Sequence, residues 1–171
     1  DAVIWMGYDR FYVYDGRVQV LPCSVRDHVF KDFNETQTDK IYAGVNSAFG
    51  EVFWFYPSQT NALSNDGTGE NDKYVVYNYD QKIWYVGSLA RSSWIDRGVY
   101  QYPMATDSNL VYNHEKGNDN DGTAFTSFIE SSPLDVQDGD QFVFLRRMIP
   151  DVSFDNSDSN ISNDNKQAVF S

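Results

Sequence analysis

The chain has 171 residues, 41% of them hydrophobic and 16% aromatic, so it is long and apolar enough to bury a core of its own. It carries 13 Lys and Arg against 25 Asp and Glu. The formal net charge of -12 argues against a module that grips nucleic acid through a basic face or adsorbs to an anionic membrane. No apolar run reaches the roughly 20 residues that a bilayer-spanning helix needs, so we expect no membrane insertion.

Cysteine usage and the chain ends bear on the cellular setting. The single cysteine, Cys23, excludes an intrachain disulfide, which fits folding in a reducing cytoplasm. Its neighbours in Val-Leu-Pro-Cys-Ser-Val are mostly apolar, which predicts a small core residue and not a nucleophile. No signal-peptide pattern is found, and the sequence starts at Asp1 and stops within Gln-Ala-Val-Phe-Ser. We therefore expect a segment of a longer chain.

The first part of the chain predicts three short antiparallel strands. Two aromatic-rich runs within residues 2–16 flank a turn at residues 7–10, and Asp15-Gly16 is a strong turn dipeptide. Residues 17–21 then alternate polar and apolar side chains and end at Pro22.

Residues 24–40 contain the one stretch with helical periodicity. Residues that would share one side of a helix recur here at three- and four-residue intervals, namely Val25, His28, Val29 and Phe33. We therefore expect a short helix that ends near Asn34. On this pattern, His28 is expected to be a packed side chain.

The middle of the chain returns to strand patterns. Residues 41–45 and 51–56 are expected to be strands joined by a turn at Asn46-Ser47. A polar loop over residues 58–72 follows, with a composition that cannot bury enough surface to fold alone.

Further hairpins are predicted beyond this loop. Residues 73–79 and 82–89 form a clear hairpin that turns at Asp80-Gln81. Residues 94–96 start another strand or corner, and residues 104–106 pair with residues 110–114.

The last part predicts strands separated by polar loops. After an acidic loop at residues 115–122, strands are expected over residues 124–131, 141–149 and 152–154, and residues 155–166 read as a surface loop.

Many short strands with frequent turn signals indicate a sandwich, barrel or propeller. Residues 10–16, 73–79 and 109–114 share an apolar strand that ends in Tyr before a small polar residue, as the inner strands of propeller blades would. The expected fold is all-β and antiparallel, with propeller-like blades and one short helix over residues 1–125. An adjoining strand platform is expected over residues 126–171.

A resemblance rests on five segments in a fixed order, which together span most of residues 1–155. They are residues 5–34 (WMGYDRFYVYDGRVQVLPCSVRDHVFKDFN), 51–58 (EVFWFYPS), 72–98 (DKYVVYNYDQKIWYVGSLARSSWIDRG), 102–117 (YPMATDSNLVYNHEKG) and 129–154 (IESSPLDVQDGDQFVFLRRMIPDVSF). In these segments the chain resembles the tail-nozzle proteins of short-tailed bacteriophages, also called tail tubular protein B or phage stabilisation protein.

The resemblance implies a structural virion protein that is assembled in the host cytoplasm and is not an enzyme. It implies a β-propeller-like region in a subunit that forms a ring with copies of itself. Its neighbours in the tail would be adaptor or portal-side proteins and tail fibre or needle proteins. DNA would pass through the lumen during ejection without specific binding. The resemblance carries over no catalytic residue, cofactor or metal ligand.

One stretch has the composition of a metal loop. Residues 118–122, Asn-Asp-Asn-Asp-Gly, offer alternating oxygen donors, but Gly117 takes the first ligand position and Ser127 the closing one. A solvated turn is therefore favoured over a calcium site.

A hydrolytic site is not indicated either. His114-Glu115 is the only histidine beside a carboxylate, and neither a Gly-x-Ser-x-Gly elbow nor a Cys-His signature is present. His114 is expected to serve as a capping or loop residue.

Carboxylates beside aromatic rings support a second hypothesis, a carbohydrate-binding or glycoside-cleaving β domain. Glu51 lies near Phe53 and Trp54, and Asp96 lies near Trp94. The more conservative interpretation is that the four tryptophans are strand-packing or interface residues. They are Trp5, Trp54, Trp84 and Trp94.

Two adjacent arginines, Arg146 and Arg147, follow four apolar residues of an expected strand. With a period of two, one of them is expected to point inward, paired with an acid or placed at a subunit interface. The candidate acids are Asp140 and Asp151, with Glu130 and Asp135 as further partners.

Overall fold

The computed structural model describes residues 2–59, 69–117, 122–123 and 146–147. The chain divides into two compact units, Asp1–Lys116 and Gly117–Ser171. The fold below is that of the first unit. The strands expected over residues 124–131, 141–149 and 152–154 lie outside the described residues, except for Arg146 and Arg147, which are described and are not in a strand. The boundary expected between residues 125 and 126 also lies outside the described residues, and it stays a prediction.

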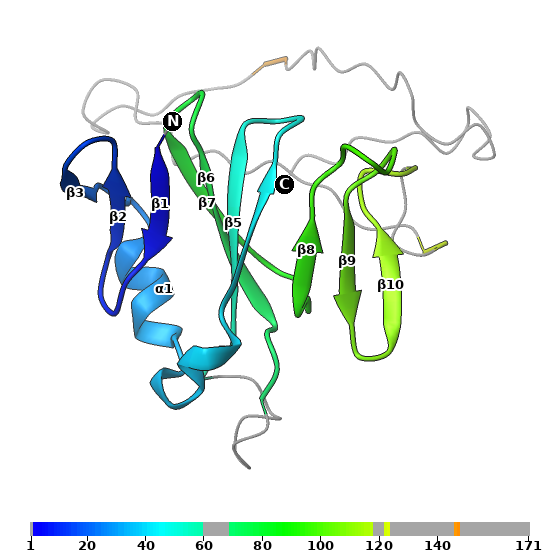
Figure 1. The fold of residues 1–171 in the computed structure, drawn as a ribbon, viewed down its shortest axis with the longest axis horizontal. Coiled ribbons are helices and arrows are strands. Elements are labelled where there is room, and N and C mark those ends of the chain that lie inside the picture. Colours follow the sequence, from blue (N-terminus) through cyan, green and yellow to red (C-terminus); the bar gives the residue numbers. More distant parts are fainter. Residues whose placement is uncertain (1, 60–68, 118–121, 124–145, 148–171) are drawn as a thin grey trace. The chain divides into compact units, whose positions relative to one another are not determined.

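A four-stranded antiparallel sheet forms the centre of the first unit (Figure 1). Its strands are β4 (Tyr42–Asn46), β5 (Glu51–Tyr56), β6 (Lys73–Asn78) and β7 (Ile83–Ser88), paired in chain order. Aromatic and β-branched side chains dominate β5 and β6, the two strands that are paired on both sides, and these residue types pack well on a pleated surface. The predicted strands and the hairpin at residues 73–89 are confirmed.

One face of the central sheet is covered by the N-terminal elements. These are the sheet β1 (Val3–Met6), β2 (Phe11–Tyr14) and β3 (Val18–Leu21), and the helix α1 (Arg26–Asp32). The ring of Phe11 lies 4.9 Å from that of Trp54 and 4.6 Å from that of Trp84. The buried members of this first core are Phe11, Val29, Phe33, Trp54, Tyr56, Val75 and Tyr77.

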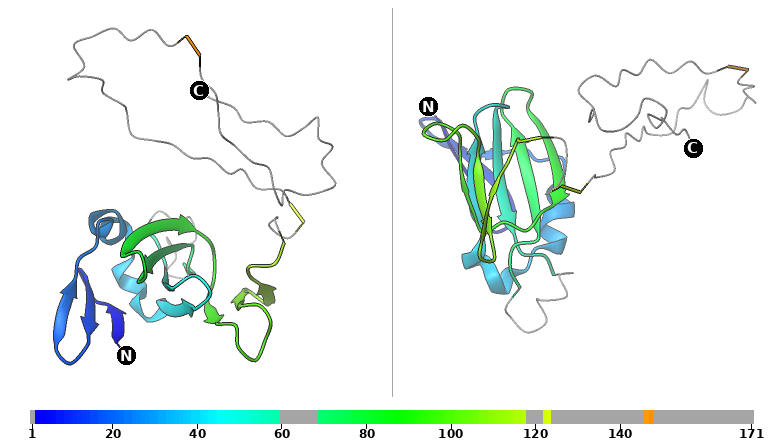
Figure 2. Two further views of the ribbon diagram at one scale, coloured as in Figure 1. Left: turned by 90° about the horizontal axis from the view of Figure 1, so that it is seen from above. Right: turned by 90° about the vertical axis from the view of Figure 1, so that its right-hand side faces the viewer.

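The opposite face of the central sheet is covered by a third antiparallel sheet. It consists of β8 (Ser93–Ile95), β9 (Met104–Asp107) and β10 (Leu110–Asn113), in the order β10-β9-β8. Figures 1 and 2 show this sheet and the N-terminal sheet on either side of the central one. The buried residues of this second core are Phe53, Phe55, Val76, Trp94 and Ala105.

The all-β, antiparallel class with few helices is therefore confirmed for the described part of the chain. The described strands form three separate sheets and do not close into a propeller. Of the three expected inner strands, β2 and β6 are paired on both sides, whereas β10 is paired only with β9 among the described strands.

The helical region differs from the prediction in two respects. The predicted short helix is present as α1 and ends at Asp32, close to the expected end near Asn34, but an unexpected 3-10 helix follows over Glu35–Lys40. This second helix is capped by the Asn34 side chain, which accepts a hydrogen bond from the Thr36 amide (3.1 Å). The prediction that His28 is packed is wrong, because its side chain is exposed, whereas Val29 is buried and Phe30 packs against the first core.

Candidate functional site

A cluster of oxygen-bearing side chains lies at one end of the face that the third sheet covers. We call it the carboxylate cluster; its members are Asn46, Glu51, Tyr85 and Glu115. Asn46 and Glu51 are directly paired across β4 and β5, and Tyr85 donates a short hydrogen bond to Glu51. The Asn46 amide nitrogen donates to a Glu115 carboxylate oxygen at 3.4 Å. Three strands and the segment after β10 thus converge on this point.

The backbone holds Glu115 at the cluster in an unusual conformation. Its φ is 56°, in the left-handed region that L residues with side chains seldom adopt. Asn46 is fully buried, and its carbonyl oxygen has no hydrogen-bond partner among the described residues. A buried amide oxygen without a partner costs free energy, so the cluster has an unmet demand for a donor or a cation.

The electrostatics of the cluster are those of unneutralised negative charge. Partial burial, followed by the charge of Glu51, raises the pKa of Glu115. Burial and the hydrogen bond to Glu51 raise the pKa of Tyr85. Neither carboxylate forms an ion pair with a Lys or Arg in the described part of the chain.

A second polar network surrounds Arg91, which is only 7% exposed. Its Nε donates to His114 Nε2 at 2.9 Å and its Nη1 to the Ala90 carbonyl, and the guanidinium lies 4.3 Å over the Tyr112 ring. Burial and the Arg91 charge lower the pKa of His114 to about 4. His114 is therefore neutral near pH 7 and accepts a hydrogen bond from arginine.

A polar cavity of about 310 Å³ adjoins Arg91. Asn71 is 3% exposed and donates to the carbonyls of Lys40 and Arg91, and its buried carbonyl oxygen has no hydrogen-bond partner among the described residues. The lining residues are Glu70, Asn71, Arg91, Ser92, Asp107 and Ser108. The lining contains both a cation and carboxylates, which suits a neutral polar ligand better than a strongly charged one.

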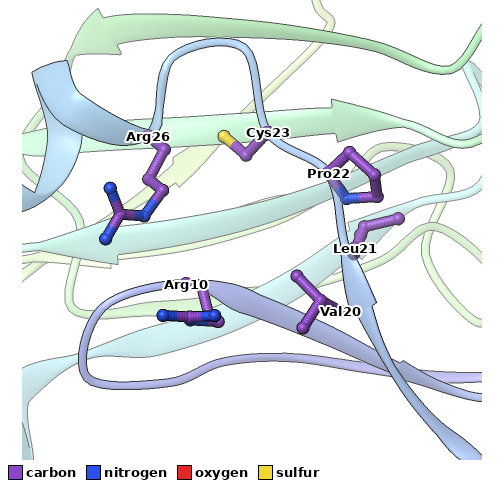
Figure 3. Close-up of a pocket in the computed structure, with 6 residues that line it drawn as sticks. All are labelled: Arg10, Val20, Leu21, Pro22, Cys23 and Arg26. Carbon is purple, nitrogen blue, oxygen red and sulfur yellow. The ribbon is translucent and has the colours of Figure 1, made fainter.

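A cavity of about 330 Å³ lies where β3 leads into α1 (Figure 3). Arg10 and Arg26 line this cavity, but both arginines already have hydrogen-bond partners. The Asp9 carboxylate binds the Arg10 guanidinium, and the Asp9 backbone carbonyl accepts a hydrogen bond from Arg26 at 2.7 Å. Burial raises the pKa of the Cys23 thiol, as it would for a packed and unreactive cysteine. Cys23 packs against the first core, as the sequence predicted.

Two of the sheets expose apolar side chains on the faces that point away from the centre. We call the outward side of β1–β3 the first outer face; its residues are Val3, Trp5, Tyr12, Tyr14, Val18 and Val20. Val3 and Val18 are each 62% exposed, and Trp5 stacks on Tyr12 at 5.4 Å. On the outward side of the third sheet, Ile95 is 51% and Val111 66% exposed.

The glycosidase candidates from the sequence do not form one site around a ring platform. Asp96 accepts hydrogen bonds from the Ser47 and Arg97 amides, whereas Glu51 is held by Tyr85. The neighbouring rings are buried, Trp54 to 1% and Trp94 to 7% exposure. These two tryptophans, and Trp84 with them, are strand-packing residues as the conservative interpretation predicted.

The remaining sequence candidates fall as follows. His114 directly follows β10, and its ring lies 4.8 Å from that of Trp94, so it packs against the second core as well as leading into a loop. Arg146 and Arg147 are both exposed and outside any strand. The expectation that one points inward within this chain is therefore wrong, while the subunit-interface alternative stays a prediction. Asp140 and Asp151 lie outside the described residues, as do Glu130, Asp135 and most of the loop at residues 118–122.

The carboxylate cluster was missed at the sequence level for a physical reason. Asn46 was expected to be a turn residue, and nothing local links Glu115 to a strand so far before it in the chain.

Among the described residues no helix is both long and apolar enough to cross a membrane. No protein-family model matches the chain, and a search of curated proteins found no significant match.

Proposed function

We propose that this chain is a structural subunit of a bacteriophage tail nozzle or hub and forms part of the conduit for DNA ejection. The observation that carries the proposal is the stacking of three antiparallel sheets in chain order, with an apolar face left exposed at each end. Successive blades of a propeller pack on one another in this way, and an uncovered blade face needs a further blade or another subunit against it.

The first outer face is the stronger of the two indications of assembly. A monomeric soluble protein rarely exposes a contiguous row of aromatic and branched side chains on a sheet. A heterologous contact, in which different faces of neighbouring copies meet, generates a ring when the rotation closes. A ring of copies is therefore the proposed quaternary state, with tail adaptor and fibre or needle proteins as further partners.

The net charge supports the conduit part of the proposal. A chain with a formal net charge of -12 carries a surplus of acidic groups that repel phosphate, so DNA would move past it without being held. The proposal assigns no catalytic activity to the chain and places it in the virion tail.

The experiment is to measure the mass of the full-length protein in solution and to image it by negative-stain electron microscopy. A closed ring with a central hole, formed alone or on addition of the tail adaptor, is expected. A protein that remains monomeric under both conditions would remove the basis for the nozzle proposal.

A carbohydrate-binding β domain is the second candidate, favoured by the polar cavity beside Arg91. Its volume of about 310 Å³ and its mixture of carboxylate, amide, guanidinium and hydroxyl groups suit the hydroxyls of a sugar ring. A glycan array separates the two candidates. Reproducible binding that is lost in Asp107→Ala favours a lectin-like role, whereas the absence of binding to any glycan leaves the structural role as the remaining candidate.

A further inference from the structure

The carboxylate cluster presents oxygen ligands without a positive charge to balance them. Glu51 is paired with Asn46 across β4 and β5, and the Asn46 amide donates to Glu115 at 3.4 Å, so both carboxylates lie beside the same residue. Within the described residues neither carboxylate is paired with a basic side chain. Two like charges brought together by the fold are costly unless a proton or a cation lies between them. The Tyr85 hydroxyl does not neutralise the pair, because it only donates a hydrogen bond to Glu51.

Asn46 supplies a second and independent observation. Its side chain is fully buried and directed at Glu115, yet its carbonyl oxygen has no partner among the described residues. Rotating the amide by half a turn exchanges its nitrogen and oxygen and directs the oxygen at the Glu115 carboxylate. Without a cation, that orientation places two oxygen acceptors against each other and is unfavourable. It becomes favourable once a cation binds to both oxygens. A cation would thus coordinate the rotated amide oxygen and balance the charge of the carboxylates, while the amide nitrogen would take the buried position that the oxygen leaves.

We propose that Asn46, Glu51 and Glu115 bind a hard divalent cation, with Ca²⁺ as the metal that fits best. All three would bind through oxygen, which favours Ca²⁺ or Mg²⁺ over zinc or copper. Ca²⁺ is preferred because it tolerates irregular geometry and mixes carboxylate with amide oxygens, whereas Mg²⁺ demands near-ideal octahedral coordination. Tyr85 would orient Glu51 from outside the coordination sphere.

The location gives the cation a structural consequence. Asn46 ends β4, Glu51 begins β5, and Glu115 follows β10, so a bound ion would fasten the end of the third sheet to the central sheet. With only two carboxylates, affinity in the range of roughly 10⁻⁴ to 10⁻³ M is expected. This inference does not depend on the proposed function, because it concerns three side chains within one copy of the chain.

The test is calorimetric titration of CaCl₂ into full-length protein stripped with a chelator, together with thermal unfolding with and without Ca²⁺. The wild type is expected to bind Ca²⁺ and to unfold at a higher temperature when it is present. Glu115→Gln keeps the size of the side chain and its bond to Asn46 but loses the charge, and it should weaken binding at least about tenfold. Asn46→Asp, which adds an oxygen ligand and a charge, should bind Ca²⁺ more tightly than the wild type does.

Asp119→Asn/Asp121→Asn is the matched control, because it removes two carboxylates from the neighbouring acidic loop. Wild-type affinity in this control supports the carboxylate cluster as the site. The proposal is overturned if millimolar CaCl₂ produces neither heat nor a thermal shift, or if Glu115→Gln binds as the wild type does. Loss of binding in the control alone would also overturn it, by placing the ion in the loop.

Discussion

Gly44 lies directly beneath the indole of Trp94, so close that a Cβ on Gly44 would be 2.5 Å from Trp94 Cδ1. The indole nitrogen donates to the Val45 carbonyl at 2.9 Å, and the ring stacks on Phe53 at 5.1 Å. Because this hydrogen bond and the stacking on Phe53 hold the Trp94 ring in place, the ring has no room to move away from an added methyl group. This contact fixes the third sheet against β4.

Gly44→Ala is therefore expected to destabilise the protein by about 1–3 kcal/mol, the usual cost of overpacking a close-packed site. Urea unfolding followed by tryptophan fluorescence measures the change. Gly98→Ala is the control, since a Cβ at Gly98 meets nothing within 4 Å, and it should change stability by less than about 0.5 kcal/mol. Equal stability of the two variants would show that Trp94 can shift at little cost.

His114 makes stability depend on pH in a defined direction. Its pKa is lowered from 6.5 to about 4 in the folded protein, by burial and by the Arg91 charge. Between these values the unfolded chain binds a proton at His114 and the folded chain does not. The free energy of unfolding should therefore fall as the pH falls from 6.5 to 4, and this contribution should level off below 4.

His114→Gln keeps an acceptor for Arg91 but removes this titration, so its unfolding midpoint should fall less than that of the wild type over this pH range. The raised pKa of Glu115 acts with the opposite sign, and comparison with the wild type cancels it. His28→Gln, at the exposed histidine, is the matched control and should follow the wild type. A parallel pH dependence in wild type and His114→Gln would contradict the assignment.

The strands could be predicted from the sequence because their signals are local. Runs of aromatic and β-branched residues on either side of Asp80-Gln81 predict the hairpin of β6 and β7. Two short turn sequences predict the boundaries between β1, β2 and β3. The 3-10 helix over Glu35–Lys40 was missed because its sequence, ETQTDK, is polar throughout and has no periodicity. His28 was misplaced because it lies at the edge of the apolar stripe of α1, where spacing alone does not decide burial.

The candidate sites were largely unpredictable because tertiary packing creates them. Asn46 reads locally as a turn residue, and only the packing of the third sheet buries it and brings Glu115 to it. Arg91 lies between small and polar neighbours in a run that ends in Trp94, and nothing local signals that its guanidinium meets His114. Local periodicity identifies strands, but it does not identify which distant side chains meet across a core.

The first outer face leads to a prediction about assembly. Val18 is 62% exposed on that face, beside Tyr14 in the register of β2 and β3. Val18→Lys places a charge within the proposed contact, on its edge strand β3, and should weaken self-association at least about tenfold, since an unpaired charge buried in an interface is strongly unfavourable. The thermal midpoint of the subunit should stay close to that of the wild type because Val18 contributes little to the core. Mass photometry over a dilution series measures the association.

Val99→Lys is the matched control for that experiment. Val99 is 95% exposed and lies outside the first outer face and outside the strands of the third sheet, so the same substitution there adds the same charge without entering the proposed contact. It should associate as the wild type does. If both variants weaken association equally, net charge and not the first outer face governs it. If neither does, the apolar row on β1–β3 is not the surface through which copies meet, and the exposed Ile95 and Val111 become the next positions to charge.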